Sequence, residues 1–257
     1  MTLLVVRDLD KAFGGVVAAR RVGFSVDRGE LLALIGPNGA GKTTTFNMVG
    51  GQLAPDGGTV HLDGEDVTAL SPREKFRRGV GRTFQVAQTF LSMTVAENVQ
   101  MALISHRHRT RSFGRAARTL YRDEALAILD RVGMREAADR PGSTLAYGDV
   151  KRIELAIALA GEPKLLLMDE PTAGMAPRER AGLMETTRRI AREHRIGVLF
   201  TEHDMASVFA HADRILVLVR GEIIAGGGPD EVRANPRVKE AYLGETGVAA
   251  ALQARRG

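Results

Sequence analysis

Short apolar runs alternate along this chain with longer stretches in which apolar side chains recur every three or four positions. The runs at 31–35, 165–170 and 196–204 have the length and composition of buried parallel strands. A basic helix is predicted at about 177–194, between the second and the third of these runs. Alternation of strands and helices favours an α/β fold with a parallel-sheet core.

A second pattern covers residues 87–161, where helical periodicity dominates. Three segments, 96–104, 116–133 and 149–161, carry apolar residues three or four positions apart. They predict a separate helical subdomain inserted into the α/β core. Within it, residues 106–122 hold six arginines and two histidines but no acid. We expect an exposed or membrane-facing basic segment rather than a nucleic-acid patch, because aromatic side chains are sparse there.

Antiparallel pairs are predicted on either side of the core. Residues 2–6 and 22–26 read as short strands, and Asp63-Gly64 marks a tight hairpin. Another hairpin is expected near the end of the chain, around Arg220-Gly221. We therefore predict one domain over residues 1–247. Its parts are a core with a small antiparallel β subdomain (1–86 and 162–247), the helical subdomain (87–161) and a frayed tail (248–257).

Composition narrows the class of protein. The chain has 257 residues, 44% of them hydrophobic, which is enough for a substantial core. Charged residues or glycine interrupt every apolar run before the roughly 18 to 20 residues that a bilayer requires. The first residues lack a signal-peptide pattern, so we expect the protein to stay in the cytoplasm. Zero cysteines exclude disulfides and thiolate sites. The net charge of +5 permits an acidic partner without selecting one.

The strand at 31–35 runs into a glycine-rich loop that fits the pattern GxxxxGK[ST]. Glycines let successive backbone N–H groups approach a polyphosphate, and the following helix directs its positive dipole end at the same anion. Lys42 can reach the terminal phosphates, and the Thr43 hydroxyl can ligate magnesium. The residues predicted to bind nucleotide here are Gly36, Pro37, Asn38, Gly39, Ala40, Gly41, Lys42, Thr43 and Thr44.

Polar residues at the ends of the other strands discriminate among nucleotide-binding proteins. Asp169 has the placement of a magnesium-organising carboxylate, and Glu170 can polarise a water for attack on the terminal phosphate. His203 can contact that phosphate from another strand, and Gln85 can orient water or metal. Phe13, read alone, is predicted to be a core residue rather than a ring that stacks on a base.

Together these motifs resemble an ATP-binding-cassette (ABC) ATPase over nearly all of residues 2–244, and more narrowly the ATP-binding subunits of branched-chain amino-acid importers. The resemblance implies a P-loop NTPase (RecA-like) core that uses ATP and Mg²⁺. It implies that Phe13 stacks on adenine and that Lys42 binds phosphate. It further implies Thr43, Gln85 and Asp169 near the metal, Glu170 as general base and His203 as the switch histidine. The motifs that carry it are Phe13, GPNGAGKTT, RTFQ, LAYGDVKR, LLLMDEPTAG and FTEHD.

The family's signature segment, usually LSGGQ, aligns with Leu145, Ala146, Tyr147, Gly148 and Asp149. In the family this segment touches the nucleotide of the opposite subunit, which implies a dimer. Ala146 lacks the usual serine hydroxyl, so we expect backbone N–H groups near Gly148 to hold phosphate. Asp149 replaces the usual glutamine, and we expect its carboxylate to face away from phosphate. Ala176 stands where Asp or Asn is common.

The resemblance also implies partners. They are a second ABC ATPase, identical or not, transmembrane permease subunits and, indirectly, an extracytoplasmic binding protein, with this chain peripheral on the cytoplasmic face of the membrane. No specific nucleic acid is expected. Three alternatives stay open from the sequence: an ABC ATPase for another cargo such as urea, an aromatic acid or a lipid, a soluble nucleic-acid-associated ABC protein, and a small-molecule kinase.

Overall fold

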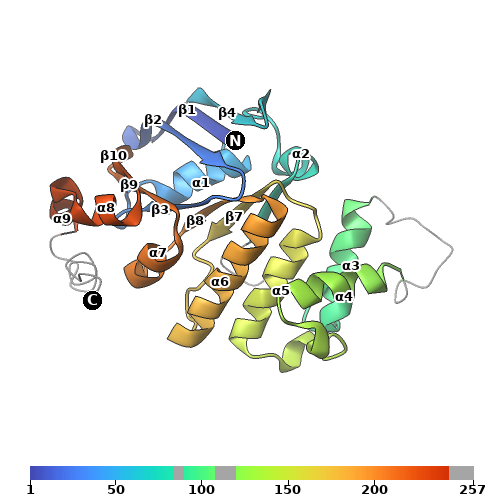
Figure 1. Ribbon diagram of the computed structural model, residues 1–257. Helices are drawn as coiled ribbons and strands as arrows, with labels where there is room; N and C mark the ends of the chain where they lie inside the picture. Colours follow the sequence, from blue (N-terminus) through green and yellow to red (C-terminus); the bar gives the residue numbers. More distant parts are fainter. Residues whose placement is uncertain (84–89, 108–119, 243–257) are drawn as a thin grey trace.

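The computed structural model describes residues 1–83, 90–107 and 120–242, and the N-terminus lies beside the strands of the smaller sheet (Figure 1). The strands of this part are β1 (Thr2–Phe13), β2 (Val16–Asp27), β3 (Leu31–Ile35), β4 (Gly57–Leu62), β5 (Glu65–Asp66), β6 (Val80–Thr83), β7 (Leu165–Asp169), β8 (Gly197–Thr201), β9 (Arg214–Val219) and β10 (Glu222–Gly227). The helices are α1 (Lys42–Gly50), α2 (Pro72–Arg77), α3 (Val95–His106), α4 (Arg122–Arg131), α5 (Tyr147–Leu159), α6 (Pro177–His194), α7 (Met205–His211), α8 (Pro229–Ala234) and α9 (Pro236–Ala241), with 3₁₀ turns at Arg135–Ala137 and Gly142–Thr144.

The larger sheet has the strand order β10-β9-β3-β8-β7-β6 in the described part of the chain. Strands β9, β3, β8, β7 and β6 run parallel, and β10 joins antiparallel to β9. Every residue of β3 and β8 is buried, as expected for strands covered on both faces. The predicted α/β class with a parallel core is therefore confirmed, together with its antiparallel sheet and its helices.

The smaller sheet, β2-β1-β4-β5, is antiparallel, and its apolar face packs with α1 against one face of the larger sheet. Phe46 of α1 and Leu32 and Leu34 of β3 belong to this cluster. Strands β1 and β2 extend well beyond the predicted 2–6 and 22–26. The rest of β1 is mostly polar, and register shifts interrupt its pairing with β2, which hides the strand periodicity in the sequence.

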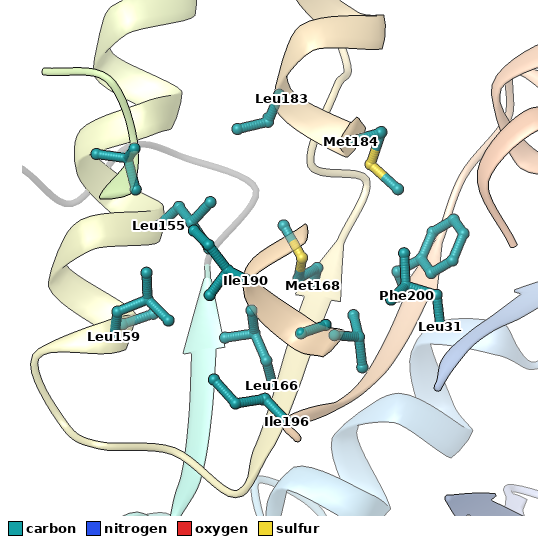
Figure 2. Packing of buried hydrophobic residues seen from close by; sticks show 14 of the residues in the cluster. Leu31, Leu155, Leu159, Leu166, Met168, Leu183, Met184, Ile190, Ile196 and Phe200 are labelled. Atoms are coloured by element: carbon teal, nitrogen blue, oxygen red, sulfur yellow. The ribbon is translucent and has the colours of Figure 1, made fainter. Parts of the chain in front are cut away.

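The opposite face of the larger sheet forms a second core with α3 to α7 (Figure 2). Because strand side chains alternate between the two faces, Leu31, Ala33 and Ile35 point into this cluster while Leu32 and Leu34 point into the other. Met168 of β7 and Phe200 of β8 lie beneath α6 in the same cluster. These contacts fix the order of the central strands, and with it which loops become neighbours at their carboxyl ends.

Helices α3, α4 and α5 gather at one side of the molecule (Figure 1). Helix α3 begins at a capping box, in which Thr94 Oγ1 accepts from Glu97 N at 3.2 Å and Glu97 Oε2 accepts from Thr94 N at 2.9 Å. Of the predicted helix 116–133, the described part contains α4, which covers Arg122–Arg131. Residues 116–119 and most of the arginine-rich segment 106–122 lie outside the described residues. Within the described ranges no helix has the length and apolarity to cross a membrane.

Candidate active site

The loop between β3 and α1 has the backbone that its glycines were predicted to allow. A Cβ atom at Gly41 would lie 2.0 Å from the Ala18 carbonyl oxygen, and one at Gly36 would lie 2.1 Å from the Leu218 carbonyl oxygen. Gly41 also has φ 101°, in the left-handed region. Only glycine fits these two positions, so the loop is held close to the ends of β2 and β9.

Helix α1 begins at Lys42 directly after this loop. No side chain caps its N-terminus and no acid lies in its first turn, so its backbone N–H groups and positive dipole end can receive an anion. The Lys42 side chain is 8% exposed and donates from Nζ to the carbonyl oxygens of Gly36 at 2.6 Å and Pro37 at 3.1 Å. The ammonium therefore lies over the loop that the phosphate-binding prediction requires.

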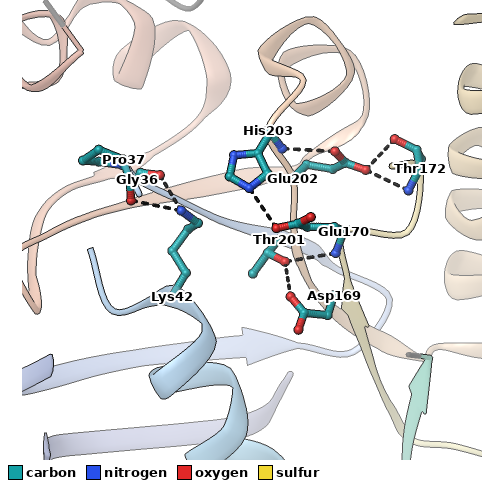
Figure 3. Close-up of polar contacts among 9 residues, drawn as sticks. All are labelled: Gly36, Pro37, Lys42, Asp169, Glu170, Thr172, Thr201, Glu202 and His203. Atoms are coloured by element: carbon teal, nitrogen blue, oxygen red, sulfur yellow. Dashed lines mark hydrogen bonds and ion pairs between the residues drawn. The ribbon is translucent and has the colours of Figure 1, made fainter. Parts of the chain in front are cut away.

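Strand β7 carries two carboxylates to the same edge of the sheet (Figure 3). Thr201, at the end of the neighbouring strand β8, donates from Oγ1 to Asp169 Oδ1 at 2.7 Å and accepts from the Glu170 backbone N–H at 3.1 Å. Glu170 has φ 48°, which is uncommon for a residue with a side chain. Thr201 thus fixes both the orientation of the Asp169 carboxylate and the turn that aims Glu170.

His203 follows β8 and meets Glu170. Its Nε2 lies 2.8 Å from Glu170 Oε1, with the imidazole about half exposed and the carboxylate 22% exposed (Figure 3). Buried Glu202 ties the two loops together, because it accepts from the backbone N–H of His203 at 3.1 Å and from that of Thr172 at 2.9 Å. Glu170 thus contacts a histidine whose backbone N–H is held by a buried carboxylate.

A magnesium site fits this edge chemically. The hydroxyl of Thr43 in the first turn of α1 and the carboxylate of Asp169 are hard oxygen donors, and Mg²⁺ commonly takes few protein ligands besides phosphate oxygens and water. No cluster of three His, Asp or Glu side chains suited to a metal occurs within the described ranges. The predicted Gln85 lies outside the described residues.

Arg82 of β6 is a basic neighbour of Asp169 that the sequence did not single out. Its Nη2 lies 3.7 Å from Asp169 Oδ2 and donates to Asn47 Oδ1 at 2.9 Å, and its guanidinium stacks over the Phe46 ring at 5.0 Å. Burial lowers the pKa of Arg82 from its ordinary value, and the negative charge of Asp169 opposes that shift. The candidate metal site therefore has a cation built in beside its carboxylate.

The position of Phe13 contradicts one of its two predicted roles, that of a core residue. It ends β1 at the tip of a hairpin, is 50% exposed and has Lys11 Nζ 5.6 Å from its ring centroid. The prediction of a core residue is wrong, because β1 extends beyond the apolar cluster that its first half joins. An exposed ring at this tip is available for stacking, and its role as the adenine platform stays a prediction.

The segment aligned with the family signature forms the start of α5. Ala146 is the N-cap and, having no hydroxyl, offers no side-chain hydrogen bond to the helix. A Cβ at Gly148 would lie 2.9 Å from Glu179 Oε1 of α6, so the Glu179 carboxylate packs directly against this glycine. Leu145 precedes the cap, Tyr147 is 46% exposed, and Asp149 lies in the first turn. The α5 N-terminus thus has no side-chain cap, but two carboxylates lie near it, Asp149 in its first turn and Glu179 beside Gly148, and its contact with phosphate stays a prediction.

The structure brings together side chains that follow β3, β8 and β7, three adjacent strands whose carboxyl ends share one edge. Thr201 and Glu202 were missed as site residues. A signal for them exists, since both are polar residues at the end of an otherwise apolar strand directly before His203. Arg82 begins the RTFQ motif, but the sequence does not show its contact with Asp169, because that contact depends on β6 lying beside β7.

Comparison with protein families places the site in context. Residues 19–173 match a family model described as ABC transporter, and residues 222–248 match one described as branched-chain amino acid ATP-binding cassette transporter. The first match includes the phosphate loop, the signature segment, Asp169 and Glu170. The second covers β10 and the helices that follow it.

Individual proteins similar to this chain are ATP-binding proteins of transport systems. The chain is 41% identical to the high-affinity branched-chain amino acid transport ATP-binding protein LivG of Escherichia coli strain K12 and 39% identical to BraF of Pseudomonas aeruginosa, in both cases over 95% of this chain and 98% of the relative. The lipopolysaccharide export system ATP-binding protein LptB of Escherichia coli is 34% identical with the same coverage. A crystal structure of the ADP conformation of an ATP-binding cassette of an ABC transporter superposes with TM-score 0.85 at 31% identity, covering 95% of this chain and 99% of that one.

Proposed function

The chain belongs to the ABC transporter family as an ATPase that powers transport, and from this premise we propose that it energises import of branched-chain amino acids. The cargo assignment is supported by relatives named for that cargo, at 39% and 41% identity over nearly the whole chain, and by the C-terminal match at 222–248. The observation that carries the catalytic part is the contact of His203 with Glu170 at the same sheet edge as Lys42 and Asp169.

In the proposed reaction a water attacks the terminal phosphorus of ATP, the bond from that phosphorus to the bridging oxygen breaks, and ADP and phosphate leave. Glu170 accepts the proton of the water, and His203, 2.8 Å away, keeps the carboxylate oriented. Lys42 and the first N–H groups of α1 neutralise the phosphate oxygens. Magnesium, held by Thr43 and Asp169 and by Gln85 from beyond the described residues, supplies further charge neutralisation when bound.

We further propose that each ATP lies between two ATPase subunits, in agreement with the resemblance to ABC ATPases. The uncapped N-terminus of α5, at Ala146 to Gly148, has the backbone donors that a terminal phosphate of the facing subunit requires. Phe13 would stack on adenine from the subunit that supplies Lys42. ATP binding would close the pair, and hydrolysis would reopen it. The second subunit is either a copy of this chain or a related ATPase.

A permease contact is proposed at an apolar cavity of about 310 Å³ between α1, α2, α3 and α5. Phe76, Ala102 and Ile157 line it. An apolar segment of a transmembrane subunit would fill this cavity, and Phe90 and Leu91, which precede α3 and are more than half exposed, are a separate apolar surface. The chain would then lie on the cytoplasmic face of the membrane, and a binding protein outside would act through the permease.

The similarity to LptB favours a second candidate, an ABC ATPase for a lipid cargo. The amino-acid and lipid cargo proposals are distinguished by reconstituting the chain with its membrane and binding subunits in vesicles and measuring phosphate release. Leucine, isoleucine or valine with the binding protein should stimulate hydrolysis severalfold, and lipopolysaccharide should not. Stimulation by lipid alone would replace the amino-acid proposal, and the inactive Lys42→Ala complex is the control for contaminating ATPases.

A further inference from the structure

Arg82 touches two parts of the candidate site, Asp169 and helix α1, from a strand that carries no predicted site residue within the described ranges. It lies on β6 opposite Leu167 of β7, two residues before Asp169 on that neighbouring strand. Its side chain and that of Asp169 are each only 13% exposed, and the closest approach between them is 3.7 Å. The same guanidinium donates to Asn47 at 2.9 Å, on the helix that starts at Lys42. A buried cation is thus shared by the carboxylate and the phosphate-loop helix.

A largely buried carboxylate needs a compensating charge, because water cannot screen it. Among the described residues, the hydroxyl of Thr201 at 2.7 Å and the guanidinium of Arg82 both stabilise the negative charge of Asp169. A divalent cation near Asp169 would supply the same compensation and would repel the guanidinium. Arg82 and the metal therefore compete for one negative charge.

We propose that Arg82 is a positioning residue that acts as the resident counter-charge of Asp169 and thereby sets the magnesium concentration at which the site loads. This rests on the proposed function, in which Asp169 belongs to the metal site. Besides charged Asp169, the guanidinium has Asn47 as an uncharged hydrogen-bond partner. The Phe46 ring, 5.0 Å away, stabilises the positive charge of the guanidinium. Arg82 can thus keep its position on α1 while its interaction with Asp169 weakens.

The inference predicts the direction of a change that a purely structural residue would not cause. Without the positive charge of Arg82, the metal meets an uncompensated carboxylate and binds more tightly. In Arg82→Gln we expect the half-saturating Mg²⁺ concentration to fall by about threefold or more, because one buried unit charge at this range is a sizeable electrostatic term. Arg82→Lys keeps the charge and should stay closer to the wild type than to Arg82→Gln.

The experiment titrates Mg²⁺ against purified full-length protein with a non-hydrolysable ATP analogue, and reads nucleotide binding by calorimetry and stability by thermal unfolding. The stability gap between wild type and Arg82→Gln should be larger in EDTA than with saturating Mg²⁺ and nucleotide, since the metal replaces the missing cation. The control is Arg77→Gln, which removes the same charge from an exposed position on α2.

An unchanged or raised Mg²⁺ midpoint in Arg82→Gln, or an equal stability gap under both conditions, overturns the inference. So does a shift that Arg77→Gln reproduces, because the effect would then come from net charge alone. Asp169→Asn is measured alongside: if it leaves the Mg²⁺ dependence unaltered, the metal-site assignment itself fails. If Asp169→Asn alters the Mg²⁺ dependence but Arg82→Gln does not, only the inference about Arg82 fails and the metal-site assignment stands.

Discussion

Lys75 places a full positive charge inside the protein, at the far end of the helix that begins with the phosphate loop. Its side chain on α2 is completely buried, and Nζ donates to the carbonyl oxygens of Met48 at 3.2 Å and Val49 at 2.9 Å. These carbonyls belong to the last turn of α1, where the helix dipole favours a cation. Burial nevertheless lowers the pKa of Lys75 from 10.5 to about 8, and nearby Asp66 only partly offsets this.

The lowered pKa fixes the sign and size of a pH effect on stability. Between about pH 8 and pH 10.5 the unfolded chain holds a proton on Lys75 that the folded chain has released. The free energy of unfolding therefore rises with pH across this window. The full gap between the two pKa values corresponds to about 3 kcal/mol. Between pH 7.5 and pH 9.5, the contribution is about 2 kcal/mol.

The assay is urea denaturation of wild type and Lys75→Met at pH 7.5 and pH 9.5. The difference between the free energies of unfolding of the two proteins cancels the titration of all other groups. The stability of the wild type relative to Lys75→Met should increase by about 2 kcal/mol between the two pH values. Lys239→Met, an exposed position, is the control and should follow the wild-type profile. Parallel profiles for wild type and Lys75→Met would refute the burial of a charge at this position.

Three further predictions concern the site. Gly41→Ala should abolish nucleotide binding and lower the free energy of unfolding by about 2 kcal/mol or more, because the new Cβ would lie 2.0 Å from the Ala18 carbonyl oxygen. Gly39→Ala is the control: nothing lies within 4 Å of its Cβ, so its free energy of unfolding should fall only by the cost of a positive φ, and equal losses for both variants in chemical denaturation would contradict this. Thr201→Val should lower kcat about tenfold or more with little change in KM, as it removes the hydroxyl that joins Asp169 to the Glu170 N–H; steady-state kinetics that show a raised KM alone would count against that role. Asp149→Gln should leave ATPase activity of the assembled transporter unchanged if the carboxylate faces away from phosphate, and a large gain in activity would show that it faces inward.

Elements with a strong local pattern were predictable. The apolar runs at 31–35 and 165–169 carry their strand signal in four or five consecutive side chains, and the glycine loop after the first has positions that only glycine can occupy. The same holds for α5 and α6, whose apolar residues recur with helical spacing and lie in one core cluster.

Features that depend on distant segments were not predictable. The outer half of β1 is mostly polar, and it is a strand because it pairs with the outer half of β2 through several register shifts. Phe13 was misread as core for the same reason, since nothing local shows that the hairpin reaches past the cluster. The roles of Thr201 and Arg82 follow from the strand order β8-β7-β6, which is set by packing.

The most direct test of the proposed chemistry is the identity of the nucleotide that the protein retains after incubation with Mg²⁺ and ATP. Wild-type protein, assembled with its partner subunits, should release phosphate and retain ADP. In Glu170→Gln the sites that contain this residue should retain intact ATP, because the water loses its base while Lys42 and the phosphate loop still bind. Chromatography of the extracted nucleotide distinguishes the two results. Recovery of ADP from Glu170→Gln at the wild-type rate would contradict the assignment of Glu170 and the hydrolytic site proposed around it.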